Sequence, residues 1–200
     1  MPCPTMMPGM GTPMPCPTRM PGMNTPMPCP TGMGPCSPGM MAPAALVQNG
    51  QHSDERFIDM MASHHLMAMR MAQLAQKLGQ HAPLKQLATS IITTQGQEIA
   101  ELKALKLQLY GSANTPTMMN PMQMANMGML TPDQLAQQHP FDRAFLDSMI
   151  PHHASAIEMA SVALLHSSNP DIRRIARAIV NAQSAEIGQM IQWRETWYPS

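Results

Sequence analysis

The sequence has few charged residues, 12% of the 200-residue chain, and their formal charges sum to zero. It has no basic patch with interleaved aromatic side chains, so nucleic acid and anionic membrane surfaces are not expected as partners. No apolar run approaches the roughly 18 residues of a membrane span, and we expect no membrane insertion. The first residues lack the apolar region of a secretory signal, so an exported form would already have lost its signal. These absences favour a small partner.

Cysteine is absent from the part of the chain that could form a core. The four cysteines, Cys3, Cys16, Cys29 and Cys36, all lie near the N-terminus. They give the fold no disulfide framework, and their spacings match no standard zinc site. Their thiols could bind soft metals or could oxidise in an exported protein, and the sequence leaves both fates open.

The N-terminal segment is a repeat rich in Met, Pro and Cys. The pentapeptide Met-Pro-Cys-Pro-Thr begins at positions 1, 14 and 27. Proline at this density prevents helix and sheet formation, so residues 1–50 are expected to form a disordered tail. The globular domain is expected over residues 53–198.

The globular part predicts an all-α, antiparallel four-helix bundle made of two helical hairpins. It is rich in Ala, Leu, Gln, Met and Ile, with few helix breakers. The first hairpin is expected over 53–111, with a break at 79–83. The second is expected over 132–198, with a break at Asn169-Pro170, and a Met-rich connection over 112–131 joins the two hairpins.

The second hairpin repeats the first after a shift of 88 residues without a gap, as the step from Phe57 to Phe145 shows. Further recurring pairs are Asp59/Asp147, Met61/Met149, His64/His152, His65/His153, Gln95/Gln183 and Glu98/Glu186. Such a duplication predicts two hairpins related by a pseudo-twofold axis.

Methionine is unusually abundant, with 25 of 200 residues. Many methionines lie in Pro- and Gly-rich segments, where burial in a core is not expected. A thioether is a soft donor that favours Cu(I), and by the same softness Ag(I), over hard cations. A low-complexity segment without a metal is the alternative. The accessory candidates in the connection are Met118, Met119, Met122, Met124, Met127 and Met129.

The motif Met-x-x-His-His occurs in both hairpins and is the strongest candidate metal site. In each copy the first histidine falls on the apolar stripe and should point inward. The second lies at the edge of the stripe, one helical turn from the methionine. Met69 adds a donor in the first copy, where the second has Ile157, so the two sites should differ in strength. The predicted ligands are Met61, His64, His65, Met69, Met149, His152 and His153.

Two glutamates are predicted to support the histidines. Counting through the hairpin turn places Glu98 opposite His64, and the same count places Glu186 opposite His152. Each carboxylate would accept an imidazole N–H and leave the other nitrogen for metal. The alternative is that these are core histidines satisfied by glutamate, with no metal at all.

These motifs resemble a known family. The segments Met61-x-x-His64-His65 and Met149-Ile-Pro-His152-His153, each followed by Gln-x-x-Glu, resemble the bacterial proteins grouped as domain of unknown function 305, in particular exported copper-resistance proteins of cyanobacteria. The resemblance covers about residues 53–197. It implies a ferritin-like four-helix bundle, a periplasmic or extracellular location, and Cu(I) and Ag(I) binding through Met and His.

The expected function is non-enzymatic copper resistance. The protein would lower free Cu(I) by sequestration, or pass it as a metallochaperone to a copper exporter or acceptor protein. The rival is a ferritin-like di-iron oxidase or peroxidase that uses the histidine pairs with Glu98 and Glu186. The methionine surplus and the lack of a Glu-x-x-His motif argue against it. A helical interaction module without metal is a third reading, which predicts that metals leave the stability unchanged.

Overall fold

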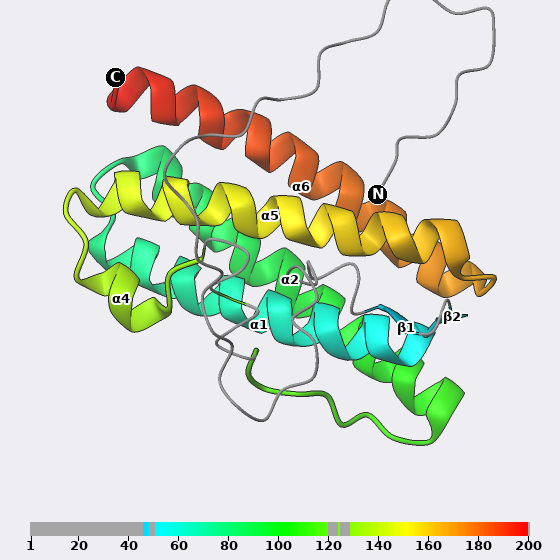
Figure 1. Ribbon diagram of the computed structural model, residues 1–200. Helices are drawn as coiled ribbons and strands as arrows, with labels where there is room; N and C mark the ends of the chain where they lie inside the picture. The colour runs from blue at the N-terminus through cyan, green and yellow to red at the C-terminus, as the bar shows by residue number, and fades with distance from the viewer. Residues whose placement is uncertain (1–45, 49–50, 120–123, 125–128, 200) are drawn as a thin grey trace, which may run out of the picture. The chain divides into compact units, whose positions relative to one another are not determined.

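A computed structural model of the protein describes residues 46–48, 51–119, 124 and 129–199 (Figure 1). Residues 1–45 and 49–50 of the expected disordered tail, with its four cysteines, lie outside the described residues, as do Met122 and Met127. Among the residues that are described, no helix has the length and apolar character needed to cross a membrane.

Four long helices make up most of the described chain. Helices α1 (Asp54–Leu78) and α2 (Ala82–Tyr110) form the first hairpin, and α5 (Phe141–His166) and α6 (Pro170–Trp197) form the second. The short helix α4 (Pro132–Ala136) leads into the second hairpin. The two hairpins meet along α1 and α5. The predicted all-α four-helix bundle is confirmed.

Local chemistry sets the ends of these helices. The hydroxyl of Ser53 accepts the Arg56 N–H at 3.3 Å and caps α1. Helix α2 is capped by Gly111, whose φ of 72° is a left-handed conformation that favours glycine. The Asn169 side chain caps α6, and Pro170 follows in the first helical position, where its missing N–H costs nothing.

A short hairpin precedes α1 and was not predicted. Strands β1 (Val47–Gln48) and β2 (Gln51–His52) pair antiparallel, with Val47 opposite His52. The sequence between the strands is Asn49-Gly50, a strong signal for a two-residue hairpin turn that the helical reading overlooked. The hairpin places His52 beside the start of α1.

The duplication is visible in equivalent ion pairs. Lys106 Nζ lies 2.6 Å from Asp59 Oδ1, and Arg194 Nε lies 2.6 Å from Asp147 Oδ1. Each pair joins the two helices of one hairpin, and both members of the second pair lie 88 residues after those of the first. The two hairpins are therefore copies in three dimensions as well as in sequence.

The apolar core is divided into two clusters along the bundle. One contains Met71, Leu84 and Phe145, and the other contains Phe57 and Ile179. In every long helix the paired histidines or the Gln-x-x-Glu motif falls between the segments that supply the two clusters. The bundle thus carries a polar layer at mid-height, where apolar side chains would each have contributed about 1.5–3 kcal/mol.

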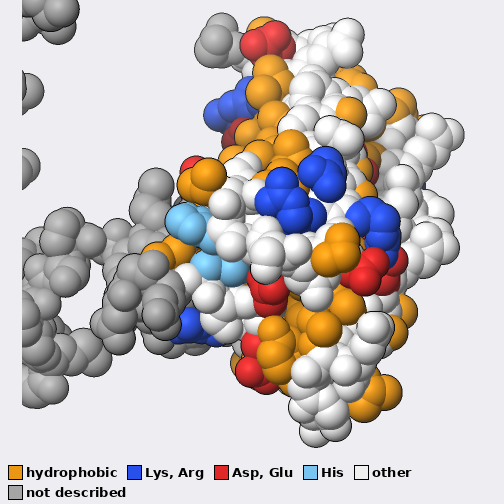
Figure 2. All heavy atoms as spheres, turned by 90° about the vertical axis from the view of Figure 1, so that its right-hand side faces the viewer, with side chains coloured by type: hydrophobic (Ala, Val, Ile, Leu, Met, Phe, Trp, Pro, Cys, Tyr) orange, Lys and Arg blue, Asp and Glu red, His pale blue; other side chains and the backbone are white. Residues whose placement is uncertain are grey.

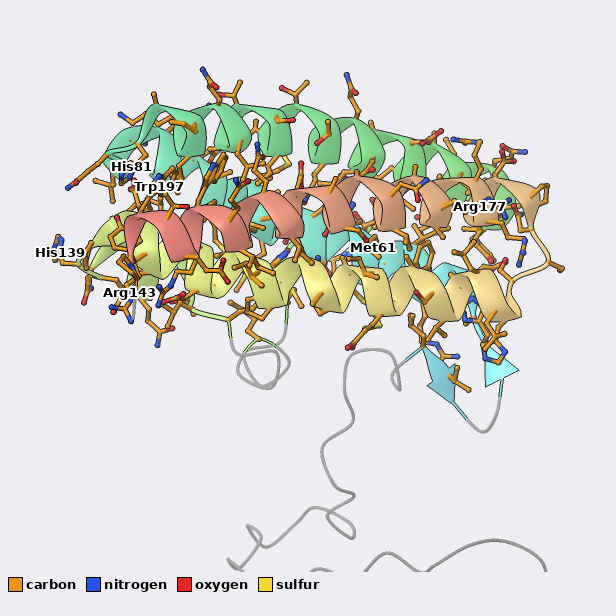
Figure 3. All side chains as sticks on the ribbon, turned by 90° about the horizontal axis from the view of Figure 1, so that it is seen from above. Met61, His81, His139, Arg143, Arg177 and Trp197 are labelled. Carbon is orange, nitrogen blue, oxygen red and sulfur yellow. The ribbon has the colours of Figure 1, made fainter. Side chains whose placement is uncertain are left out.

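A clamp at one end of the bundle fixes how the hairpins are aligned. The Asp142 carboxylate accepts the backbone N–H groups of Gln80 at 2.9 Å and of His81 at 2.8 Å, and it lies 2.7 Å from His81 Nδ1. The His81 ring stacks on Trp197, with centroids 3.8 Å apart and planes 2° from parallel. Figure 3 shows the two labelled side chains together at this end. The α1–α2 turn is therefore tied to both helices of the second hairpin.

Candidate metal centre

The polar layer is built around four histidines whose side chains are completely buried: His64, His65, His152 and His153. Two come from α1 and two from α5. The rings of His64 and His152 lie 3.7 Å apart between centroids, with planes tilted by 40°. The first histidine of each pair therefore meets its counterpart from the other repeat at the interface between the hairpins, pointing inward as predicted.

Ser155 determines the tautomer of His64. The Ser155 hydroxyl donates to the backbone carbonyl of His152 at 2.8 Å, so its proton is already used. The same oxygen lies 2.8 Å from His64 Nε2, which must therefore be the N–H donor. His64 Nδ1 is left with a lone pair. No role for Ser155 was predicted, because only the contact across the hairpins reveals it.

The predicted pairing of the glutamates with the first histidines is wrong. Glu98 Oε2 lies 2.8 Å from His65 Nε2, and Glu186 Oε2 lies 2.6 Å from His153 Nε2. Successive residues on a helix are turned by about 100°, so His64 faces α5 while His65 faces α2, where Glu98 lies. Each carboxylate contacts the second histidine of its pair, and its support of a metal ligand stays a prediction.

The two glutamate contacts differ in quality. The contact of His153 with Glu186 is a hydrogen bond, whereas His65 Nε2 faces its carboxylate at hydrogen-bond distance without the required alignment. A carboxylate accepts only, so in both cases the facing Nε2 is the protonated nitrogen and Nδ1 carries the lone pair. The side chains of Glu98 and Glu186 are 18% and 17% exposed, so each links a buried histidine to the solvent-facing surface.

Two buried glutamines complete the layer. Gln95 on α2 and Gln183 on α6 are each 2% exposed. Neither side-chain atom of either amide has a hydrogen-bond partner among the described residues. Both positions recur in the duplication, and this recurrence is the sequence signal for a shared role. The amides lie in the same layer as the histidines and offer further polar groups to a ligand.

Unpaired imidazole nitrogens are the main chemical feature of this layer. Within the described part of the chain, the Nδ1 atoms of His64, His65, His152 and His153 lack hydrogen-bond partners, as does Nε2 of His152. Buried polar atoms are normally paired, because each unpaired one costs about 1–3 kcal/mol. So many unpaired imidazole nitrogens in one layer, at least one lone pair from each histidine, indicate a site that is completed by a ligand.

Burial keeps the central imidazoles neutral. It lowers the pKa of His64 well below 6.5, and repulsion from His152, His65 and His153 lowers it further. Burial likewise lowers the pKa of His152, with repulsion from His153 and His65 as the second cause. The neutral form is the one that binds metal ions, so the layer is ready to bind at neutral pH.

The predicted methionine ligands flank the histidines. Met61 and Met149 are fully buried, and Figure 3 shows Met61 inside the bundle. Met69 is half-buried and lies against α2, where a Cβ on Gly96 would sit 3.5 Å from its Cε. Met67 is also buried in α1. Thioethers therefore occur within a helical turn of the histidines in both repeats.

The accessory methionines of the connection are mostly not exposed, contrary to expectation. Met118 is 68% exposed, whereas Met119, Met124 and Met129 are buried in the apolar cluster around Phe145. These three methionines fill the core as apolar side chains, a role that favourable burial explains without a metal. Among the described accessory candidates, only Met118 presents its thioether to solvent.

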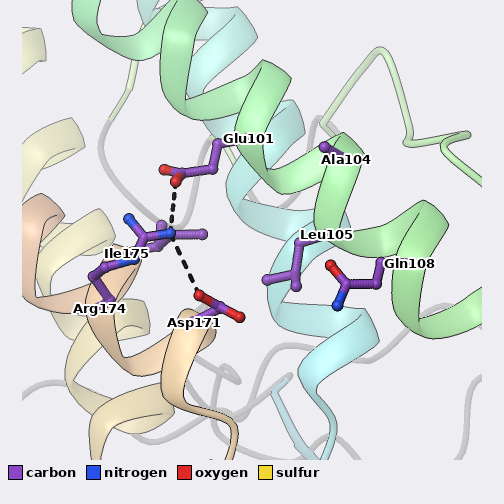
Figure 4. A pocket seen from close by; sticks show the side chains of 7 residues that line it. All are labelled: Glu101, Ala104, Leu105, Gln108, Asp171, Arg174 and Ile175. Carbon is purple, nitrogen blue, oxygen red and sulfur yellow. Dashed lines mark hydrogen bonds and ion pairs between the residues drawn. The ribbon is translucent and has the colours of Figure 1, made fainter.

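One hollow on the bundle surface is unrelated to the layer. Arg174 lies there 2.6 Å from Glu101 and 3.7 Å from Asp171, as Figure 4 shows. Its charge is already matched by two carboxylates, so this hollow has no free cation for an anionic ligand.

Comparisons with known proteins identify the family. Residues 5–106 and 54–194 both match the family model described as Domain of unknown function (DUF305). The chain belongs to the DUF305 family. Two overlapping matches fit the duplicated architecture, and the first begins at residue 5, so the likeness reaches further than the residues 53–197 taken from the motifs. Among curated proteins, none matches the chain.

Solved structures of a protein named CopM resemble this chain. In its Cu(II)-bound form CopM is 40% identical, with a TM-score of 0.68, and the match covers 74% of this chain and 99% of CopM. The Cu(I)-bound form is 37% identical, with a TM-score of 0.65 and the same coverage. A silver-soaked form is 36% identical, with a TM-score of 0.64, and covers 74% of this chain and 98% of CopM. The resemblance inferred from the sequence is confirmed.

Proposed function

We propose that this member of the DUF305 family binds Cu(I), with Ag(I) as a surrogate, in the histidine layer at the centre of its bundle. The observation that carries the proposal is the set of buried imidazole nitrogens without partners, flanked by buried thioethers. Neutral imidazole together with thioether is a soft donor set that suits Cu(I) and disfavours hard cations. CopM, with the same fold, has been solved with Cu(I) and with silver.

The residues of the layer have separate roles in this proposal. Met61, His64, His65, Met69, Met149, His152 and His153 are the candidate ligands. Glu98 and Glu186 hold the Nε2–H tautomers of His65 and His153 and thus direct Nδ1 to the ion. Ser155 does the same for His64.

The layer histidines do not by themselves make up a complete coordination shell. In the described part of the chain, no three His, Cys, Asp or Glu side chains converge as a ready-made cage. Thioethers must therefore complete the coordination, or the imidazole rings must turn. A site that closes only around the ion releases it more readily than a rigid cage, which suits a protein that buffers or transfers copper.

Copper would reach the layer between α2 and α6. These two helices touch each other at few points. A surface hollow on this side is lined by Ser90, Glu186 and Trp193, so it leads to the carboxylate that holds His153. Exposed Met118 would serve as a weaker collection site. Met122, Met127 and the tail cysteines are further candidates for collection from their sequence alone.

The physiological role that we infer is copper resistance outside the cytoplasm, without catalysis. The protein would lower free Cu(I) in the periplasm or outside the cell, by sequestration or by handover to an exporter or acceptor protein. A di-iron oxidase is less well supported, because each layer glutamate already faces a histidine of its own hairpin and neither has a histidine three residues later.

The test is an anaerobic Cu(I) titration of the full chain against a competing chromophoric chelator. The variant replaces all four layer histidines by Ala, and His139→Ala is the control, because His139 is exposed and lies away from the layer at one end of the bundle (Figure 3). A second quadruple variant with Gln in place of His guards against loss of folding, which circular dichroism would report. Replacing the four tail cysteines by Ser separates thiol binding from layer binding.

Tight binding should survive in the His139→Ala and cysteine-free chains and be lost in both quadruple variants. A folded quadruple variant that binds Cu(I) as tightly as the natural chain would show that the layer histidines are structural.

A further inference from the structure

A second pair of histidines lies at the end of the bundle opposite the His81 clamp. His52 ends β2 and His166 ends α5, and their ring centroids are 6.0 Å apart with planes 18° from parallel. Figure 2 views this end and shows histidine side chains gathered at one place on the surface. Neither residue belongs to the duplicated motif, because the equivalent positions hold Pro140 and Leu78.

His52 is prepared for a ligand in the way metal-binding histidines usually are. Its Nε2 lies 3.0 Å from Asp54 Oδ1, and because a carboxylate only accepts, Nε2 carries the proton. Its side chain is 6% exposed, and Nδ1 is buried without a hydrogen-bond partner among the described residues. A carboxylate on one imidazole nitrogen and an unpaired lone pair on the other is the arrangement that orients histidine toward a metal ion.

The spacing of the two rings fits one shared ion. Imidazole nitrogens bind transition metals at about 2.0–2.1 Å, which places the centroids of two ligating rings at most about 6.4 Å apart across one ion. The observed 6.0 Å lies inside that limit. His166 is exposed and can adjust its ring, while His52 is held by Asp54. A hollow between them, lined also by Tyr110 and Ser167, leaves room for water to complete the coordination.

We propose that His52 Nδ1 and the His166 imidazole together bind one divalent transition-metal ion, with Cu(II) bound most tightly. The described residues that line the hollow supply nitrogen and oxygen but no sulfur. Nitrogen and oxygen donors suit divalent ions, among which Cu(II) stands highest in affinity. This site takes the oxidised ion at the surface, whereas the histidine layer takes Cu(I) with thioethers, so the two sites are chemically distinct.

The test uses Cu(II) as the probe with the full chain, after its thiols have been blocked with N-ethylmaleimide so that they cannot reduce the ion. Electron paramagnetic resonance follows the first equivalent of Cu(II) through its nitrogen couplings. His166→Ala is the main variant, because an exposed residue at a helix end can be replaced without unfolding the bundle. His139→Ala is the matched control, since it removes another exposed histidine.

One tightly bound Cu(II) with two-nitrogen coupling is expected in the natural chain and in His139→Ala. His166→Ala should lose that signal, and Asp54→Asn should weaken it about 10–100-fold. Equal signals from His166→Ala and the natural chain would overturn the proposal, as would equal losses in both histidine variants, which would mean general surface binding. The Cu(I) titration should be unchanged in His166→Ala, so failure of this site leaves the layer proposal separately testable.

Discussion

His64 donates its Nε2–H to Ser155 at 2.8 Å, and the position equivalent to Ser155 in the other repeat is Met67. The central pair of histidines is therefore not equivalent, although the duplication places them symmetrically. His64 is held in one tautomer by a hydroxyl, whereas His152 has no partner on either nitrogen in the described part of the chain. The repeat with methionine at this position offers an additional thioether in place of a hydrogen bond.

Ser155→Ala should release the tautomer of His64. Removing the hydroxyl leaves a buried imidazole N–H without an acceptor, so the bundle should lose about 1–3 kcal/mol in urea unfolding. Nitrogen chemical shifts of His64 should show both tautomers in the variant and one in the natural protein. Ser161→Ala is the control, because Ser161 is exposed on the same helix. Unchanged His64 shifts in Ser155→Ala would contradict the assigned proton.

Replacing Met61 and Met149 by Leu should separate copper binding from packing. Leucine has nearly the volume of methionine, so the cost in stability should stay below about 1.5 kcal/mol per site. The sulfur is lost, so Cu(I) affinity should fall at least tenfold in the chelator competition. Met71→Leu with Met159→Leu is the matched control, because these buried methionines lie further from the histidine pairs. Equal affinities in the two double variants would remove Met61 and Met149 from the ligand set.

Glu98→Gln and Glu186→Gln should weaken Cu(I) binding without abolishing it. A neutral amide can face the histidine with either its oxygen or its nitrogen, so it no longer enforces the Nε2–H tautomer. We expect about a 10–100-fold loss of affinity for the double variant. Glu101→Gln, which alters an exposed pair with Arg174, should bind like the natural chain. A double variant with natural affinity would show that the carboxylates do not orient the ligands.

Acidification should destabilise the metal-free bundle. The pKa of His64 and of His152 is lowered by burial in the folded state, while the unfolded chain titrates near 6.5. Below pH 6.5 the unfolded state binds more protons, so the free energy of unfolding should fall by up to about 1.4 kcal/mol per histidine per pH unit. Above about pH 7.5 these groups should contribute no slope. Urea unfolding at several pH values measures this dependence of the free energy of unfolding on pH.

The matched variants for the pH series are His64→Leu with His152→Leu, and His139→Ala. The double variant should flatten the acid slope, since the buried titrating groups are gone, and His139→Ala should keep it. The same slope in all three proteins would mean that other groups cause the acid sensitivity.

Asp142→Ala should weaken the contacts at the end of the bundle that involve His81, without changing the histidine layer. It leaves the part-buried Gln80 and His81 N–H groups without their carboxylate, at a cost of up to about 1–3 kcal/mol for each donor. The urea midpoint should fall clearly, while Cu(I) affinity under native conditions should change less than threefold. A large loss of affinity would show that the clamp also sets the geometry of the layer.

The sequence predicted most of the fold because local signals and the duplication agree. Ser53, the break after Leu78 and Asn169-Pro170 mark helix ends through capping and missing N–H groups, which depend on near neighbours only. The 88-residue shift then required two similar hairpins. The small β1–β2 hairpin was missed, although Asn49-Gly50 signalled it, because two-residue strands leave no alternating pattern.

The details of the site depended on contacts between hairpins. The histidine pairs and both glutamates were found from their recurrence. The apolar stripe of the helix, however, predicted an inward orientation for only the first histidine of each pair. In a bundle each helix has two buried directions, so His65 can face α2 while His64 faces α5. The roles of Ser155 and of the paired glutamines require knowledge of which side chains meet across helices, which spacing along one chain does not give.

The division of the core into two apolar clusters with a polar layer between them bears on how a closed site can exchange its ion. Each end of the bundle holds its own hydrophobic contacts, and one end has the Asp142 clamp as well. The polar layer between the clusters has no apolar cluster of its own. Its helices can therefore separate there transiently while both ends remain assembled. Backbone amides near His64 and His152 should then exchange their hydrogens with solvent sooner than those near Phe57 or Leu84. Copper would enter while the helices are separated at the polar layer, without unfolding of the protein.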